Sequence, residues 1–194
     1  MVINFLQKNK FFRNIIYRVG NKRAIDTVGK IKKFLNKNNS ILDIGSGTCN
    51  VYEVLLKKGY NVVGLDVRNL SFVENIKPVL YDGDKIPFED NTFDVALLLT
   101  VLHHLPYPEK IIKEAMRVSK KVIIIEDIYS NIFSQYLTYF FDCICNLEFI
   151  GHPHTNKDDK QWKDVFLQHG LNIMNIRYDN LFFIFKQATY YLMK

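Results

Sequence analysis

The chain has 194 residues, of which 48% are hydrophobic and 24% are charged, and this composition excludes an intrinsically disordered protein. The length suits one domain, which we expect to span residues 1–194. The net charge of +6 would suit an anionic partner, but no nucleic-acid-binding motif accompanies the basic residues. We therefore expect no specific binding to nucleic acid.

The cysteines and the start of the chain predict a cellular compartment. Cys49, Cys143 and Cys145 form an odd and sparse set, unlike a disulfide framework. The first ten residues lack the long apolar region and cleavage site of a secretory signal, and no stretch reaches the ~18 uncharged apolar residues of a membrane span. These features favour a cytoplasmic protein with reduced thiols.

The predicted elements alternate between helices and strands along the chain. Two helices, over residues 3–19 and 22–37, come first and form an N-terminal cap over 1–37. The remaining predicted helices cover 51–58, 71–76, 108–118, 132–150 and 160–169, and the predicted strands cover 40–45, 60–66, 79–81, 94–99, 121–126, 171–178 and 181–187. Alternation with apolar strands indicates the α/β class, with a doubly wound, mostly parallel sheet and helices on both faces.

A glycine-rich turn follows the first predicted strand. Gly45 and Gly47 permit a tight turn and let backbone N–H groups approach a ligand at the start of a helix. Asp66 ends the next strand, where a carboxylate can accept hydrogen bonds from the hydroxyls of a ribose. The pattern predicts a nucleoside cofactor. A nicotinamide cofactor is less favoured, because Asn50 replaces the third glycine of the dehydrogenase fingerprint.

Four segments carry a resemblance to a known family. They read ILDIGSGTCN at 41–50, VVGLDV at 62–67, YDGDKIPFEDNTFDVALLLTVLHHL at 81–105 and QWKDVFLQHGL at 161–171. In order and spacing they resemble the small seven-stranded class I S-adenosylmethionine-dependent methyltransferases. The resemblance implies a Rossmann-like fold with seven strands, S-adenosyl-L-methionine as cofactor, and methyl transfer to a small-molecule acceptor.

The resemblance also assigns roles at the methionine end of the cofactor. It implies that Asp43 and the backbone of Gly45 and Gly47 line this end, and that the carbonyl of Leu99 approaches the sulfonium. One position departs from the family pattern, because Cys49 stands where the family usually has glycine. The difference raises the question whether this turn is as tight as the corresponding turn in the family.

The resemblance assigns four further residues to the nucleoside end of the cofactor. Asp66 is expected to bind the ribose and Val67 to pack on the adenine. Asp82 corresponds to the acid that holds the adenine amino group, and Gly83 to the backbone N–H that reaches a ring nitrogen. Asp66 and Asp82 follow adjacent predicted strands, at the edge where open α/β sheets bind ligands.

Methyl transfer needs mainly alignment, desolvation and removal of a proton, so no triad or metal cluster is required. His104, His152 and His154 are candidate general bases because imidazole titrates near ~6.5. For His104 the alternative is a structural hydrogen bond that orients its loop. A zinc site that joins Cys143 and Cys145 to histidines is rejected, because residues two apart on a helix point about 200° apart.

Residues 130–158 are predicted to form a lid on the substrate side. The segment is rich in aromatic residues, which either wall an apolar pocket or pack in the core. The first alternative favours a small acceptor that is apolar or lipid-like.

The first predicted helix has an apolar stripe of Phe5, Phe12, Ile15 and Val19. We expect the helix to cap the cofactor site and to bury this stripe against the protein's own core. On this interpretation one of Tyr17, Arg18 and Arg23 reaches the carboxylate of the cofactor. The alternative is a peripheral membrane contact, in which basic residues of the helix bind anionic lipid: Lys8, Lys10, Arg13 and Arg18.

Two other functions remain open from the residues alone. One is a nicotinamide-dependent oxidoreductase, which Asn50 and the missing early strand disfavour. The other is a non-catalytic methyltransferase-like binding or scaffold subunit, which Cys49 makes conceivable.

Overall fold

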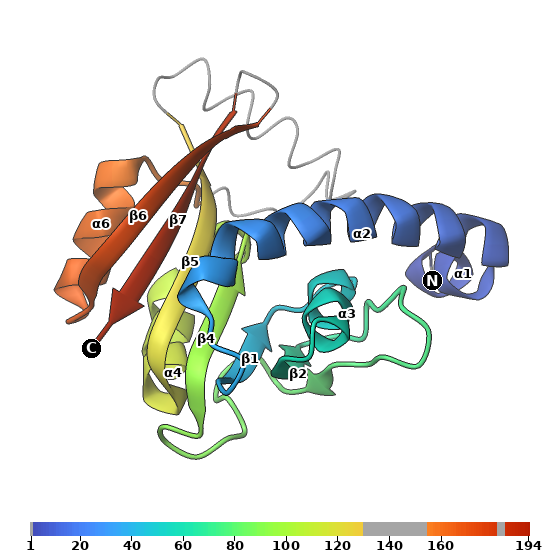
Figure 1. The fold of residues 1–194 in the computed structure, drawn as a ribbon, viewed down its shortest axis with the longest axis horizontal. Coiled ribbons are helices and arrows are strands. Elements are labelled where there is room, and N and C mark those ends of the chain that lie inside the picture. The colour runs from blue at the N-terminus through green and yellow to red at the C-terminus, as the bar shows by residue number, and fades with distance from the viewer. Residues whose placement is uncertain (1, 130–154, 182–184) are drawn as a thin grey trace.

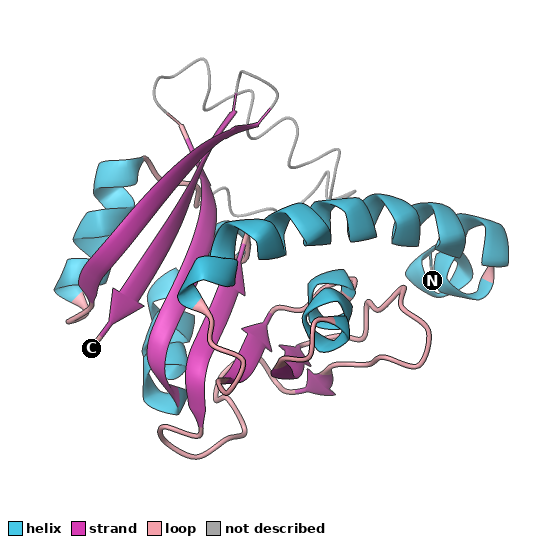
Figure 2. Ribbon diagram, viewed as in Figure 1, coloured by secondary structure: helices cyan, strands magenta, loops and turns pink. Residues whose placement is uncertain are grey.

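The computed structural model describes residues 2–129, 155–181 and 185–194. Its helices, shown with the strands in Figures 1 and 2, are α1 (Val2–Lys8), α2 (Lys10–Ile31), α3 (Asn50–Lys57), α4 (Pro108–Val118) and α6 (Asp159–Gln168), with 3-10 turns η1 (Lys32–Phe34) and η2 (Leu102–His104). Its strands are β1 (Ser40–Ile44), β2 (Asn61–Asp66), β3 (Val79–Leu80), β4 (Phe93–Leu99), β5 (Ser119–Ile128), β6 (Asn172–Leu181) and β7 (Phe185–Met193).

The strands form one seven-stranded sheet in the order β3-β2-β1-β4-β5-β7-β6. Neighbours from β3 to β5 pair in parallel, whereas β7 runs antiparallel to both β5 and β6. This arrangement confirms the predicted doubly wound, mostly parallel sheet. Because β1 lies between β2 and β4, the chain reverses its winding direction next to β1, and ligands of open α/β sheets bind at that point.

Each face of the sheet is covered by its own apolar layer. Alternate residues of a strand point to opposite faces, so Ala96 and Leu98 join one layer while Val95 and Leu97 join the other. The first layer includes residues of α4 and α6, and the second includes residues of α2 and α3. Burial on both faces explains the continuous apolar runs of β4 and β5.

The N-terminal helices differ from the prediction of two helices over 3–19 and 22–37. The first break falls at Asn9, whose side chain caps α2 by accepting from the backbone N–H of Phe11 (3.0 Å) and Phe12 (3.3 Å). No break occurs at Gly20, where the glycine lets α2 pack closely on α3. A Cβ there would lie 2.4 Å from Oδ1 of Asn50.

The predicted helix over 71–76 is wrong. The side chain of Asn69 accepts from the N–H of Ser71 (3.2 Å), and the hydroxyl of Ser71 accepts from the N–H of Val73 (3.2 Å). Such local side-chain bonds compete with helix formation. Pro78 follows closely and removes a further backbone donor, so the segment stays a loop that leads from β2 to β3.

The last strand lies further along the chain than the predicted strand over 181–187. β7 is an interior strand, and its polar residues Gln187 and Thr189 are buried. Gln187 accepts from Nζ of Lys30 on α2 (2.8 Å) and donates to Asp127 on β5 (2.7 Å). Burial of these polar side chains concealed the strand from a prediction based on apolar residues.

The apolar stripe of the N-terminal helices is exposed, so the expectation that it packs against the core is wrong. Phe5, Phe12, Ile15 and Val19 are all exposed. The side of α2 that faces α3 is instead built from residues such as Ala24 and Val28. Figure 1 shows the N-terminal part of α2 extending past α3, with α1 folded back beside it. Among the described residues, no helix is long and apolar enough to cross a membrane.

Candidate active site

The glycine-rich turn joins β1 to α3 at the carboxyl edge of the sheet. Gly45 and Gly47 have left-handed backbones, with φ of +73° and +49°. A Cβ on Gly45 would lie 2.7 Å from Cγ2 of Val101, in the loop after β4, so this position admits no larger residue. The N–H of Gly45 donates to the carbonyl of Leu65 (2.8 Å), which ties the turn to β2.

The backbone conformation of Cys49 shows why glycine is usual at this position in the family. Its φ is +60°, in the left-handed region that costs a non-glycine residue roughly 1 kcal/mol. The thiol is fully buried, with Sγ 3.7 Å from the carbonyl oxygen of Gly47. Burial raises its pKa to about 12, so the thiol stays protonated. The turn therefore accommodates Cys49 without opening, which weakens the argument for a scaffold subunit.

Asp43 is a buried carboxylate beside this turn. Its side-chain oxygen Oδ2 is buried and has no hydrogen-bond partner in the described structure. Burial raises the pKa of Asp43 to about 7, a hydrogen bond with Ser46 opposes this rise, and the charge of Asp66 adds to it. An acceptor that is buried and unpaired indicates a missing partner, because buried polar groups are nearly always hydrogen-bonded.

Asp66 holds its carboxylate against the glycine-rich turn. Oδ2 accepts from the N–H of Gly47 (2.8 Å), and Oδ1 accepts from the N–H of Arg68 (3.2 Å). The residue ends β2 and is buried, so these two bonds fix its orientation. Asp43 and Asp66 thus lie on adjacent parallel strands and face the same turn.

The structure brings the other nucleoside-end residues to the same edge. Asp66 pairs with Leu80 in the sheet, two residues before Asp82. Gly83 has a φ of +89°, and a Cβ there would lie 3.2 Å from Cγ1 of the exposed Val67. Asp82 is exposed, and its Oδ1 accepts from the N–H of Asp84 (2.9 Å). These residues thus lie at the edge of the sheet where Asp66 ends β2, and their roles toward a cofactor stay predictions.

Leu99 ends β4 next to the glycine-rich turn. The hydroxyl of Thr100 donates to the Leu99 carbonyl (2.6 Å), and the N–H of Thr100 donates to the carbonyl of Ile125 on β5 (2.7 Å). Thr100 has a φ of +58°, a rare conformation for a β-branched residue, and the chain turns there toward Val101. This turn brings Val101 against Gly45.

A buried acid–histidine pair that the sequence analysis missed supports the loop after β4. Nδ1 of His103 lies 2.6 Å from Oε2 of Glu126, and both side chains are almost fully buried. Oε1 of Glu126 also accepts from the N–H of Val101 (3.0 Å) and of Leu102 (2.8 Å). The signal in the sequence was Glu126, an acid that directly follows the apolar run 122–125 of β5.

The pair gives a loop-orienting role to His103, the neighbour of the predicted His104. His104 is half-buried, and its ring centroid lies 4.1 Å from that of His103. Thr155 contacts this loop. Its Oγ1 lies 3.0 Å from the carbonyl oxygens of both His103 and Leu105. His152 and His154 lie outside the described residues, as do Cys143, Cys145 and most of the predicted lid over 130–158.

Asn50, which replaces the third glycine of the dehydrogenase pattern, connects the turn to the N-terminal helix. Its Nδ2 donates to the carbonyl of Tyr17 (3.3 Å), and the hydroxyl of Tyr17 donates to Glu53 (2.9 Å). Tyr17 is therefore engaged with α3. Arg18 and Arg23, the other two candidates for the cofactor carboxylate, are exposed.

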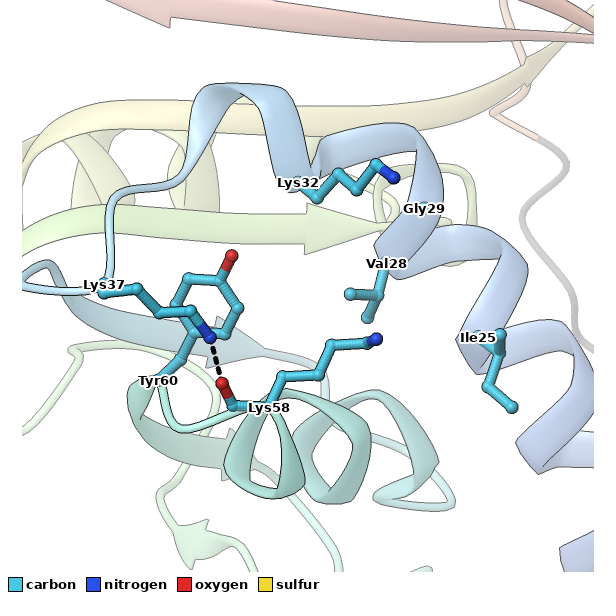
Figure 3. Close-up of a pocket in the computed structure, with 7 residues that line it drawn as sticks. All are labelled: Ile25, Val28, Gly29, Lys32, Lys37, Lys58 and Tyr60. Carbon is cyan, nitrogen blue, oxygen red and sulfur yellow. Dashed lines mark hydrogen bonds between the residues drawn. The ribbon is translucent and has the colours of Figure 1, made fainter.

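A cavity of about 420 Å³ lies away from this site. It is lined by residues of α2 and η1, of the loop before β1 and of the turn between α3 and β2, all labelled in Figure 3: Ile25, Val28, Gly29, Lys32, Lys37, Lys58 and Tyr60. Nζ of Lys37 lies 4.0 Å from the ring centroid of Tyr60 and donates to the carbonyl of Lys58. Tyr60 precedes β2, whereas Asp66 ends it, so the cavity lies at the opposite end of that strand. Among the described residues, no group of three or more potential metal ligands occurs.

Comparison with known proteins supports the resemblance seen in the sequence. Residues 42–124, which contain the glycine-rich turn, Asp66 and Leu99, match the family model described as a methyltransferase domain. This match agrees with a class I S-adenosylmethionine-dependent methyltransferase over that part of the chain.

Two curated methyltransferases are similar to the chain. It is 30% identical over 142 residues to sterol 4-C-methyltransferase strm-1 of Caenorhabditis elegans, an alignment that covers 64% of this chain and 42% of the relative. It is 26% identical over 148 residues to the ubiquinone/menaquinone biosynthesis C-methyltransferase UbiE of Rickettsia prowazekii, covering 61% of this chain and 60% of the relative. The match thus spans about half the length of these relatives.

A solved methyltransferase has a similar fold. Magnesium protoporphyrin IX methyltransferase of Synechocystis, crystallised with bound SAH, superimposes with a TM-score of 0.64 at 16% identity. The alignment covers 96% of this chain and 88% of the Synechocystis protein. This similarity extends the match to nearly the whole chain at the level of fold.

The buried state of Asp43 predicts a distinctive pH dependence. The folded chain keeps this proton up to about pH 7, whereas the unfolded chain loses it near ~3.9, so Asp43 lowers stability as the pH rises between these values. The Asp43→Asn variant has no such proton to lose. Its free energy of unfolding, minus that of the wild type, should rise by about 4 kcal/mol between pH 4 and pH 8 in urea titrations. A constant difference would show that Asp43 ionises normally.

Proposed function

We propose that the chain is an S-adenosyl-L-methionine-dependent methyltransferase that acts on a small, apolar acceptor. The observation that carries the proposal is the unpaired, buried Oδ2 of Asp43, next to the glycine-rich turn and to Asp66. A buried carboxylate with a free acceptor suits the ammonium group of the cofactor's methionine portion. An ammonium ion there would also stabilise the ionised form of Asp43.

The residues at the carboxyl edge fit the rest of this cofactor. Gly45 and Gly47 carry no side chains, so a ligand can approach the backbone of the turn closely at these two positions. The Asp66 carboxylate is held in place by two backbone N–H groups and retains acceptor capacity for the ribose hydroxyls. Val67 offers an exposed apolar surface for the adenine, with Asp82 and Gly83 beside it.

The bound cofactor supplies an electrophilic methyl group on a sulfonium. The chain's own residues then have to orient the acceptor, exclude water and take a proton where the acceptor carries one. The His103–Glu126 pair keeps the loop after β4 in place beside the turn. For the proton we propose His104, His152 or His154, of which the structure describes His104.

The nature of the acceptor is supported by the names of the two relatives. One is a sterol methyltransferase and the other acts in ubiquinone/menaquinone biosynthesis, so both names point to apolar, membrane-soluble molecules. The aromatic composition of the segment 132–150 agrees with an apolar acceptor, because aromatic side chains commonly line such sites.

Methyl transfer can be tested with cofactor that carries a radiolabelled methyl group. The full chain is incubated with this cofactor and a total lipid extract, and radioactivity is counted in the organic phase and in the aqueous phase. We expect label in the organic phase with the wild type and none with Asp66→Ala. Label that enters only water-soluble products would contradict the apolar acceptor. A lack of transfer to every extract fraction would contradict the activity.

A further inference from the structure

We infer that the N-terminal helices dock this protein on an anionic lipid bilayer. The surface concerned, called here the N-terminal apolar face, consists of Phe5, Phe11, Phe12, Ile15 and Val19. All five side chains are exposed, with Phe11 at 67% and Val19 at 62%. Exposed apolar patches of this kind mark interaction surfaces in soluble proteins.

The helix α2 has two distinct sides. Phe11, Ile15 and Val19 follow one another at intervals of four residues, so they lie along one side of the helix. The other side contacts the protein through Gly20, against Asn50, and through the buried Ala24 and Val28. One side of α2 therefore packs against the rest of the protein, and the N-terminal apolar face is exposed to another partner.

The apolar face is continuous with α1. The rings of Phe5 and Phe12 lie 6.1 Å apart between centroids, and those of Phe11 and Phe12 lie 5.5 Å apart. A turn capped by Asn9 joins the two helices and keeps these three rings together. Clustered exposed phenylalanines are suited to insertion at the boundary between lipid headgroups and acyl chains.

The segment that carries the face is basic. Residues 1–25 contain six basic residues and no acidic one, so they account for the whole net charge of +6, while residues 26–194 hold 20 residues of each sign. Arg18 and Lys22 lie three residues after Ile15 and Val19, so they border the apolar face. Within the described part of the chain, Arg13 alone among the six forms an ion pair, with Glu74 at 3.9 Å.

An anionic bilayer fits this combination better than two other partners. A nucleic acid would match the charge but would leave the phenylalanine cluster in water, because interfaces with nucleic acid are polar. A second copy of the chain would cover the apolar residues but would bring two sets of six positive charges together. A membrane surface with anionic headgroups satisfies both the apolar and the basic residues.

The position of the face agrees with the proposed acceptor, and this step rests on the proposed function. Nε2 of Gln7 on α1 donates to the carbonyls of Asn69 (3.2 Å) and Ser71 (3.0 Å), in the loop that follows Asp66 and Val67. The N-terminal helices therefore lie at the carboxyl edge of the sheet, beside the candidate cofactor site. Docking through this face would bring the site close to a membrane-dissolved acceptor.

Vesicle flotation of the full chain tests the inference without cofactor or acceptor. We expect binding to phosphatidylcholine vesicles that contain about one-third phosphatidylglycerol, and little binding to phosphatidylcholine alone. Phe11→Ser/Val19→Ser should weaken partitioning about tenfold. Arg18→Glu/Lys22→Glu should weaken it by about thirtyfold or more, since each basic residue contributes about fivefold near an anionic surface.

Two control variants are matched to these changes. Leu167→Ser/Met174→Ser removes two apolar side chains of similar exposure, 58% and 55%, and Lys113→Glu/Lys160→Glu changes the net charge equally at exposed sites of α4 and α6. Both controls should bind vesicles as the wild type does. Thermal stabilisation by S-adenosylhomocysteine, measured on each variant, reports separately on the proposed function.

Three results would overturn the inference. The first is no binding of the wild type to anionic vesicles. The second is an equal loss in the matched controls, which would indicate attraction to the whole basic protein rather than to this face. The third is self-association in the absence of lipid that Phe11→Ser/Val19→Ser abolishes, which would assign the face to a second copy of the chain.

Discussion

Replacing Asp66 by alanine is expected to weaken S-adenosylhomocysteine binding at least about 100-fold. The carboxylate can accept charge-assisted hydrogen bonds from the ribose hydroxyls, each worth about 1.5–3 kcal/mol. The variant also loses the bonds from the N–H groups of Gly47 and Arg68 that fix the end of β2. Titration calorimetry measures the change in affinity.

Two further variants separate a role in binding from a role in folding. Asp66→Asn keeps an acceptor for the N–H of Gly47 but removes the charge, so it should bind more tightly than the alanine variant and more weakly than the wild type. Asp84→Ala removes an exposed acid from the neighbouring loop and should leave the affinity unchanged. Equal affinities of the Asp66 and Asp84 alanine variants would show that the ribose site lies elsewhere.

Replacing His103 by alanine is expected to lower the free energy of unfolding by about 3–5 kcal/mol. The change leaves Oε2 of Glu126 buried without its partner, which is strongly destabilising for a paired group in the protein interior. It also loosens the loop after β4, whose N–H groups at Val101 and Leu102 donate to the same carboxylate. Urea unfolding followed by circular dichroism gives the free energy.

The neighbouring histidine provides a control for this prediction. His104 is half-buried, so His104→Ala should cost at most about 1 kcal/mol. If His104 takes the acceptor's proton, this variant will retain cofactor binding and lose methyl transfer. A small, equal loss of stability in the two variants would contradict the structural role of the His103–Glu126 pair.

The parallel part of the sheet could be predicted from the sequence because its signals are local. β1, β2 and β4 are apolar runs bounded by polar residues or glycine, and α4 begins at Pro108, as expected for proline at the first turn of a helix. The glycine-rich turn and Asp66 fall at the ends of these strands. The candidate cofactor residues Asp43, Gly45, Gly47, Asp66, Val67, Asp82, Gly83 and Leu99 could therefore be placed at one edge of the sheet from the sequence, whereas their roles in binding stay predictions.

Features that depend on distant contacts could not be predicted in this way. The partner of His103 lies 23 residues away on β5, and Gly20 continues its helix because it meets Asn50 on α3. The polar residues of β7 are buried by contacts with α2 and β5, which no local pattern reveals. The exposed side of α2 is a further case, since apolar periodicity predicts an apolar stripe but not which surface covers it.

Titration calorimetry of the full chain with S-adenosylhomocysteine, and separately with NAD, tests the central claim most directly. The account predicts saturable binding of S-adenosylhomocysteine at one molecule per chain and no binding of NAD. Binding of NAD without binding of S-adenosylhomocysteine would contradict the account in favour of an oxidoreductase. Binding of neither ligand would contradict it in favour of a scaffold that has kept the methyltransferase fold alone.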